Sequence, residues 1–314
     1  MKKFLIKFLM FVICAVCFYT AMILFAGSFL PRRWNKNINY NLPGNGYLYT
    51  RLKDADTSKN VDVLILGSSK AYMGYDVRIF KKHNLTAFNL GSPAQSFALT
   101  ELLLKRYLDR FNPKLIIFDV FPTIFGKDGV GSALDVVSNA KIGTDILKMS
   151  LQINDIRVYN TLLYSYYRQS FILNKAYVEP ERKDFGKYIK GGFVQSYNHS
   201  GYKVPNQVPK INIQTTSTQL EAFNRVILLL KSHKINYVLV QTPIDSSLYK
   251  SIQNNNELDK SIAKQGVYIN LNKLLKFPHM LFVDDVHLNQ EGVVKSNEFL
   301  ISLLKEKKLL PGHL

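Results

Sequence analysis

Short apolar runs alternate with amphipathic stretches along most of the chain. Near-continuous Val, Ile and Leu predict strands that are covered on both faces, and the longer periodic stretches between them predict helices. The predicted strands are residues 61–67, 85–91, 114–121, 235–242, 267–271 and 280–285. The predicted helices are residues 70–81, 95–110, 217–233, 247–264 and 290–308. This order predicts an α/β fold, a flavodoxin-like three-layer sandwich with a mainly parallel sheet.

The alternation is interrupted between about residues 123 and 216, which indicates an insertion. Amphipathic or aromatic helices are expected at about 141–174, and a polar loop region rich in Gly, Lys and Tyr follows through Pro209. Tyrosines are dense from Tyr159 to Tyr202. They fit a lid whose rings stack on a glycan or lipid, and they equally fit aromatic packing inside an irregular insertion.

The N-terminal segment is the longest apolar stretch and predicts one transmembrane helix. Residues 8–30 carry no charge, and at about 1.5 Å per residue they are long enough to cross a bilayer. A cleaved signal peptide is the alternative, with small residues at 26–28 as the cleavage site. Its apolar region would normally span only about 7 to 15 residues, so we favour an uncleaved signal anchor.

Four parts of the chain follow from this pattern. Residues 1–7 are expected to be a cytoplasmic stub, residues 8–30 the membrane anchor and residues 31–60 a polar stalk broken by Pro and Gly. The main domain is expected at residues 61–308.

The orientation of the anchor is not decided by charge, because basic residues flank both of its ends. Long domains translocate largely regardless of such charges. Cys14 and Cys17 both lie in the apolar segment, so the remainder of the chain has no thiol that could mispair in an oxidising compartment. We therefore expect a single-pass protein of the cell membrane, with a cytoplasmic N-terminus and an extracytoplasmic domain.

The chain is strongly basic, with 41 Lys and Arg against 23 Asp and Glu and a net charge of +18. A basic domain beside a membrane favours anionic partners, such as a cell-surface polysaccharide, a teichoic acid or lipid headgroups. Nucleic acid is not expected, because the domain is predicted to be extracytoplasmic and has no recognisable binding motif. A lysine-rich proteome would explain the same charge without any partner.

Polar residues occupy the carboxyl ends of several predicted strands, where open α/β sheets bind ligands. Gly67–Ser69 follows the first strand, Asn89–Gly91 follows the second, and Asp284–His287 precedes the last helix. Together they supply a serine nucleophile, a histidine base and a carboxylate to orient it. No metal-ligand spacing or phosphate loop appears, so neither a metal nor a cofactor is expected.

Three short blocks resemble the motif blocks of the SGNH/GDSL hydrolase superfamily. They are Gly67-Ser68-Ser69, Asn89-Leu90-Gly91 and Asp284-x-x-His287-Leu288-Asn289. They resemble more closely its membrane-anchored, extracytoplasmic branch, such as the DltD proteins of lipoteichoic acid D-alanylation and the alginate O-acetylation proteins. The resemblance implies that Ser69 is the nucleophile, His287 the general base and Asp284 the orienting carboxylate. Asp285 is the alternative orienting group.

The same resemblance implies an oxyanion hole with an incomplete donor set. Gly91 is expected to offer a backbone N–H, and Ser68 stands where the family usually has Asp. No Gly-x-Asn-Asp stretch supplies the family's side-chain amide, and Asn89 is the candidate replacement. Loss of one such donor can cost on the order of 10² to 10³ in rate, so slow or partner-dependent catalysis is expected.

The resulting prediction is a serine-dependent O-acyltransferase or esterase. It would act on acetyl or D-alanyl esters of a cell-surface polysaccharide or teichoic acid, with a multi-span membrane O-acyltransferase as a possible partner. The alternative is a non-catalytic binding or assembly protein that keeps the same fold.

Overall fold

The centre of the molecule is a five-stranded parallel sheet. The computed structural model describes the chain apart from residues 172–176, 184, 198–207 and 313–314. The strand order is β2-β1-β3-β7-β8, and every pair is parallel. The strands are β1 (Val63–Leu66), β2 (Ala87–Asn89), β3 (Leu115–Asp119), β7 (Asn236–Gln241) and β8 (Tyr268–Asn270). The predicted α/β sandwich is confirmed.

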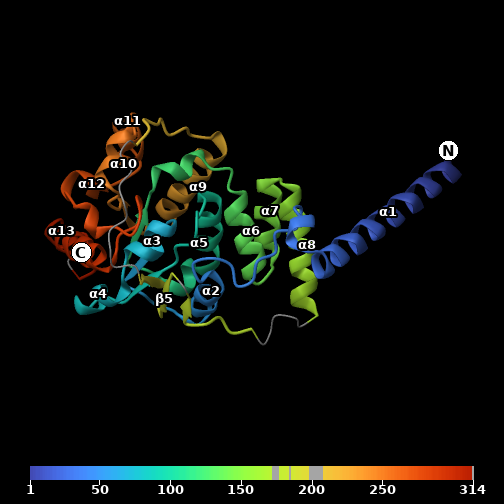
Figure 1. Cartoon of the computed structure of the whole chain (residues 1–314), viewed down its shortest axis with the longest axis horizontal. Coiled ribbons are helices and arrows are strands. Elements are labelled where there is room, and N and C mark those ends of the chain that lie inside the picture. The colour runs from blue at the N-terminus through green and yellow to red at the C-terminus, as the bar shows by residue number, and fades with distance from the viewer. Residues whose placement is uncertain (172–176, 184, 198–207, 313–314) are drawn as a thin grey trace.

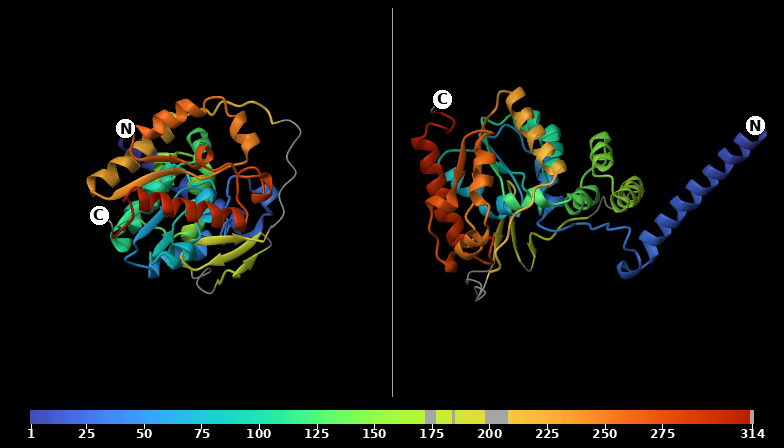
Figure 2. Two further views of the ribbon diagram at one scale, coloured as in Figure 1. Left: turned by 90° about the vertical axis from the view of Figure 1, so that its left-hand side faces the viewer. Right: turned by 90° about the horizontal axis from the view of Figure 1, so that it is seen from above.

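Helices cover both faces of this sheet, as Figures 1 and 2 show. Alternate residues of each strand point to opposite faces, so Leu64 and Leu66 belong to one hydrophobic cluster and Val63 and Ile65 to another. The first cluster includes residues of α2 (Leu48–Thr57), α5 (Phe97–Phe111) and α9 (Ser217–Ser232). The second includes residues of α3 (Ser69–Gly74), α4 (Val77–Lys82), α12 (Leu271–Leu274) and α13 (Gln290–Glu306).

Two predicted helices are each split in two. Residues 70–81 form two helices, α3 and α4. Helix α3 ends at Gly74, and Asp76 begins α4 as its N-cap by accepting a hydrogen bond from the Arg78 N–H. Residues 247–264 form α10 (Ser246–Ser251) and α11 (Asn255–Ala263).

The sixth predicted strand, residues 280–285, is wrong. The segment forms a 3-10 turn, η3 (His279–Leu281), and an isolated bridge between Phe282 and Leu288. Asp284 accepts hydrogen bonds from two backbone N–H groups just after it, so the chain turns there instead of extending along β8.

The insertion lies between β3 and α9. It contains η2 (Pro122–Gly126), α6 (Val130–Asn139), α7 (Thr144–Ile153), α8 (Ile156–Ser170) and an antiparallel sheet of β4 (Arg182–Lys183), β5 (Gly186–Ile189) and β6 (Phe193–Ser196). The helices expected at 141–174 correspond to α7 and α8, whereas α6 and the small sheet were not predicted. The part of the expected loop at 198–207, including Tyr202, lies outside the described residues.

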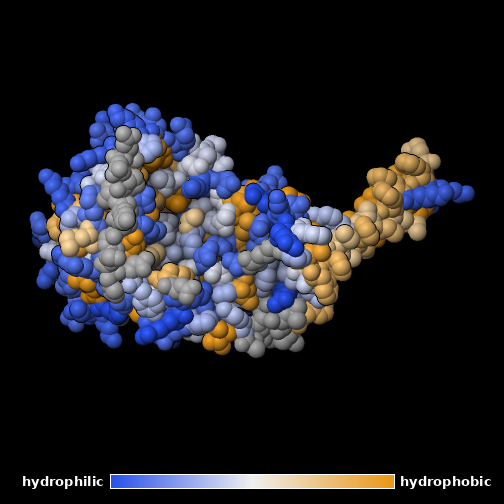
Figure 3. All heavy atoms as spheres, viewed as in Figure 1, coloured by the Kyte–Doolittle hydropathy of each residue, from blue (hydrophilic) through white to orange (hydrophobic). Residues whose placement is uncertain are grey.

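The helix α1 (Lys2–Phe29) extends away from the domain, and its surface is mostly apolar (Figures 1 and 3). Within the described part of the chain, it is the one helix long and apolar enough to cross a membrane.

The predicted stalk at residues 31–60 is wrong for its second half. Residues 48–57 form α2, whose Leu48, Leu52 and Ala55 are buried against the sheet. Their spacing of four and three residues is typical of one face of a helix. The helix was not predicted, because the residues between them are polar and Pro and Gly precede the segment.

Arg51 of α2 is fully buried and joins the small sheet to the domain. Its Nε and Nη2 donate to the Gly192 carbonyl at 3.1 and 3.0 Å, and Nη1 donates to the Gly46 carbonyl at 2.8 Å. The guanidinium also lies 4.8 Å from the centre of the Tyr72 ring. Burial lowers the pKa of Arg51, and the surrounding acceptors compensate the charge.

We expect Arg51→Met to lower the free energy of unfolding by about 3 kcal/mol, because buried carbonyls lose a charged donor. Thermal and denaturant unfolding of the full chain in detergent measures this. The matched control is Arg182→Met, an exposed arginine of the small sheet, which should change stability by less than about 0.5 kcal/mol. Equal effects of the two variants would contradict the role of Arg51.

Candidate active site

A sharp turn at Gly67 leads from β1 into α3 and presents Ser69. Gly67 has φ +142°, and a Cβ there would lie 2.7 Å from the backbone oxygen of Asp119, so only glycine fits. Ser69 is the first residue of α3 and is half-buried. The chain therefore holds its hydroxyl at the carboxyl edge of the sheet.

Ser69, His287 and Asp284 form a continuous chain of hydrogen bonds. His287 Nε2 lies 2.8 Å from Ser69 Oγ, and His287 Nδ1 lies 2.8 Å from Asp284 Oδ2. Both contacts are satisfied when Nδ1 carries the proton and Nε2 accepts from the serine hydroxyl. This arrangement can take a proton from Ser69 as its oxygen attacks a carbonyl carbon.

The carboxylate of Asp284 is fixed by the turn that it creates. Asp284 Oδ1 accepts the backbone N–H groups of Val286 at 2.9 Å and His287 at 2.7 Å. Burial alone would raise the pKa of Asp284, but the hydrogen bonds from His287 and the backbone outweigh it and keep the pKa below its usual value. Asp284, rather than Asp285, therefore contacts the imidazole. The backbone carbonyl of Asp285 accepts the Asp245 N–H.

Asn89 does not stand in for the missing oxyanion amide, which corrects the expectation from the sequence. Its side chain is fully buried, and Nδ2 donates to the carbonyls of Ala71 at 2.7 Å and Tyr75 at 3.1 Å. Its Oδ1 accepts the Gly91 N–H at 3.1 Å. Asn89 thus joins the end of β2 to α3. Its side-chain oxygen also accepts the Gly91 N–H, which was expected to donate to an oxyanion.

Gly91 has a packing reason to be glycine. A Cβ there would lie 2.8 Å from the Cβ of Ala71 and 2.9 Å from the Tyr72 nitrogen. The missing side chain lets the loop after β2 approach α3, which differs from the expected role of admitting an intermediate.

The backbone N–H of Ser69 lies in the first turn of α3, where amides have no intrahelical acceptor, so its role as an oxyanion donor stays a prediction. Ser68 occupies the N-cap position, but its side chain makes no capping hydrogen bond. Among the described residues its buried Oγ has no partner. A role for Ser68 toward substrate remains a prediction.

Lys70 is the residue that sequence reasoning missed. It is 2% exposed, and its Nζ donates to the carbonyls of Pro243 at 2.6 Å and Val286 at 2.7 Å. Val286 directly precedes His287. The ammonium of Lys70 therefore joins α3 to the loop that carries His287, which we call the histidine loop. A lysine directly after the proposed nucleophile, in a short helix that is otherwise mostly buried, was the available signal.

Asp119, at the end of β3, is a buried carboxylate whose charge acts on Lys70. The carboxylate accepts hydrogen bonds from the Tyr75 hydroxyl at 2.8 Å and from the backbone N–H of Thr242 at 3.1 Å, and also from the Thr242 hydroxyl. Burial raises the pKa of Asp119, and the positive charge of Lys70 opposes that rise. Asp119 thus joins the end of β3 to Tyr75 and to Thr242, which follows β7.

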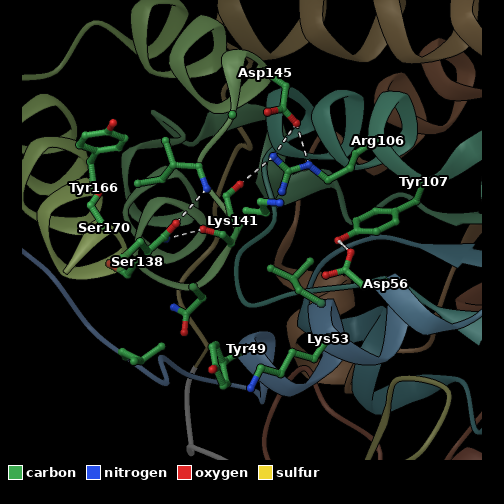
Figure 4. A pocket seen from close by; sticks show the side chains of 17 residues that line it. Tyr49, Lys53, Asp56, Arg106, Tyr107, Ser138, Lys141, Asp145, Tyr166 and Ser170 are labelled. Carbon is green, nitrogen blue, oxygen red and sulfur yellow. Dashed lines mark hydrogen bonds and ion pairs between the residues drawn. The ribbon is translucent and has the colours of Figure 1, made fainter. Parts of the chain in front are cut away.

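A sizeable pocket lies away from these residues. A pocket of about 750 Å³ opens between α2, α5 and the helices of the insertion, with Lys53, Arg106 and Tyr166 among its walls (Figure 4). None of the proposed site residues lines it. Across the described residues, no three His, Cys, Asp or Glu side chains gather in a way that could hold a metal ion.

No family model matches the chain, and no curated protein matches it. Solved structures give distant likenesses to a candidate platelet activating factor from Streptococcus pneumonia, a candidate acylhydrolase from Bacteroides fragilis and a GDSL-like lipase from Bacteroides thetaiotaomicron. Their identities are 11, 10 and 11% and their TM-scores 0.44, 0.43 and 0.40. The matches cover 85, 85 and 84% of this chain and 95, 99 and 98% of those chains. Likeness at this distance carries no argument about activity.

Titration of Lys70 should appear in the pH dependence of stability. Burial lowers the pKa of Lys70 from 10.5 to about 8, although nearby carboxylates oppose the shift. Between these values the unfolded chain binds a proton that the folded chain does not. The free energy of unfolding should therefore rise by roughly 2 to 3 kcal/mol from pH 8 to pH 10.5, relative to Lys70→Met.

Denaturant unfolding across this pH range measures the difference between the two proteins. Lys59→Met, which removes an exposed lysine, is the control and should follow the wild-type curve. Parallel curves for wild type and Lys70→Met would show that Lys70 does not titrate in this range.

Proposed function

We propose that this chain is a membrane-anchored, serine-dependent enzyme of acyl esters, an O-acyltransferase or esterase. The hydrogen-bond chain from Asp284 through His287 to Ser69 carries the proposal, because the same constellation activates serine on unrelated folds. Its substrates would be acetyl or D-alanyl esters of an extracytoplasmic polysaccharide or teichoic acid.

The chemistry proceeds in two balanced steps. Ser69 Oγ attacks the ester carbonyl while His287 Nε2 takes its proton, and the imidazolium then protonates the departing alcohol. An acyl-serine remains. A hydroxyl of the polymer, or water, attacks it after giving its proton to His287, and the serine recovers that proton when the acyl group leaves.

Transfer is preferred to hydrolysis because α1 would keep the site beside a membrane donor. A multi-span membrane O-acyltransferase is the partner proposed to deliver the acyl group. The net charge of +18 suits an anionic polymer as acceptor.

A non-catalytic assembly protein is the second candidate, and the engaged Gly91 N–H favours it. With the Gly91 N–H held by Asn89, one of the donors expected for an oxyanion is lost. A site that lacks a donor can be slower by about 10² to 10³. Such a site would need a partner to complete it, or would no longer turn over.

Labelling by a fluorophosphonate probe distinguishes the two candidates. We expect the full chain in detergent to be labelled at Ser69, because the His287 base makes its oxygen nucleophilic. Ser69→Ala should abolish labelling, and His287→Ala should reduce its rate by roughly 10³-fold or more.

The matched control is His83→Ala. His83 also contacts a carboxylate, Glu298, at 2.6 Å, but it is exposed and lies outside the proposed site. Its labelling should equal that of wild type. A folded wild-type chain that takes up no probe would overturn the catalytic proposal and favour the assembly protein.

The cellular test is the amount of base-labile acyl ester on the surface polymer. Cells that carry Ser69→Ala in place of wild type should lose the ester and keep normal amounts of the protein. Undiminished ester in the Ser69→Ala strain would overturn acyl transfer to the polymer, whereas an increase would indicate that the enzyme hydrolyses the ester.

A further inference from the structure

Helix α8 packs against the outer part of α1. The Tyr19 hydroxyl donates to Asn160 Oδ1 at 2.7 Å, and a Cβ on Gly27 would lie 2.6 Å from the Tyr164 ring. Ile23 lies between these contacts and is 8% exposed, in a cluster with Tyr164. The contact therefore extends along α1 from Tyr19 to Gly27.

The contact on α1 begins inside the membrane in either placement of the span. The helix has 28 residues, about 42 Å, whereas the hydrocarbon core of a bilayer is about 30 Å thick and takes about 20 residues. A span that begins at Phe8, after the last lysine, ends near Gly27. One that begins at Phe4 ends near Ile23. Tyr19 lies within the outer half of the span in both cases.

One face of α8 continues the contact beyond α1. Leu163 and Tyr167 pack beside Tyr164 in the same cluster, and the spacing of four and three residues puts Ile156 and Phe171 on this side as well. Ile156 is 54% exposed and Phe171 is 66% exposed, past the two ends of the contact.

The charges and aromatic rings around this face suit a membrane boundary. Asp155 and Arg157, which flank Ile156, pair with each other at 2.7 Å. Beyond the end of α1, the ring of Trp34 is exposed, and the guanidinium carbon of Arg33 lies 5.9 Å from the centre of that ring. Aromatic residues concentrate at such interfaces, and a neighbouring arginine can meet lipid phosphates.

We propose that α8 is an interfacial helix that rests in the outer leaflet, with the face formed by Ile156, Leu163, Tyr167 and Phe171 against lipid. The face is continuous with α1, which lipid must surround, so lipid is its proposed occupant. The domain is then held to the membrane by two helices, and its rotation about α1 is restricted. The inference concerns attachment and does not depend on the proposed reaction.

The chain has one tryptophan, Trp34, which makes a clean fluorescence test possible. In a Trp34→Phe background, tryptophan replaces Phe171 or Ile156. The matched control replaces Leu274, which is 51% exposed on α12, on the side of the domain away from α1 (Figure 1). Each full chain is placed in nanodiscs whose phosphatidylcholine and phosphatidylglycerol carry bromine near the carbonyl end of the acyl chains in both leaflets.

We expect roughly twofold quenching at positions 171 and 156 relative to unbrominated discs, because an interfacial helix buries its apolar face about 5–10 Å into this region. The control at position 274 should keep its intensity, and native Trp34 should be quenched. Unchanged melting temperatures verify that the exposed substitutions leave the fold intact. Quenching of Trp34 with none at 156 and 171 would overturn the proposal, and would favour a membrane protein as the occupant of this face.

Discussion

The buried ammonium of Lys70 is the contact on which the candidate site depends. It joins α3, the end of β7 and the histidine loop by donating to the carbonyls of Pro243 and Val286. These segments are far apart in sequence, and each ends in a loop that could otherwise adopt several conformations. Hydrogen bonds from a charged donor, shielded from water, are strong and directional. Lys70 therefore helps to set the position of His287 relative to Ser69, together with the turn that Asp284 forms.

A buried cation needs compensation, and the site provides it within the fold. Asp119 lies at the end of the central strand β3 and is itself held by Tyr75 and Thr242. Its negative charge offsets that of Lys70, and the positive charge of Lys70 offsets the burial of the carboxylate. The two side chains are not in direct contact, so each influences the other through its charge, while hydrogen bonds to other groups hold each in place.

The sequence was sufficient for the parts of the structure that follow periodic patterns. The sheet, most covering helices and the end position of Ser69 follow from apolar periodicity and from the carboxyl-edge rule. Asp284 and His287 were found by their motif, because the strand predicted before them is a 3-10 turn. The role of Asn89 could not be predicted in this way, because it depends on how closely β2 approaches α3. Lys70 was missed for a related reason: its acceptors are backbone carbonyls, which leave no trace in the residue pattern. The short β4–β6 strands carry too few residues for a detectable period.

The insertion and the sandwich contribute different parts of this molecule. The sandwich builds the serine site from strand ends, and the insertion supplies α8, which packs on α1 through Asn160 and Tyr164. The small sheet of the insertion is in turn fixed to the domain by Arg51. A single membrane helix on a flexible tether would leave the site free to rotate and to vary its height. Attachment through both α1 and α8, as proposed, would restrict both quantities, and an enzyme that exchanges groups between a membrane donor and a surface polymer would require both to be fixed.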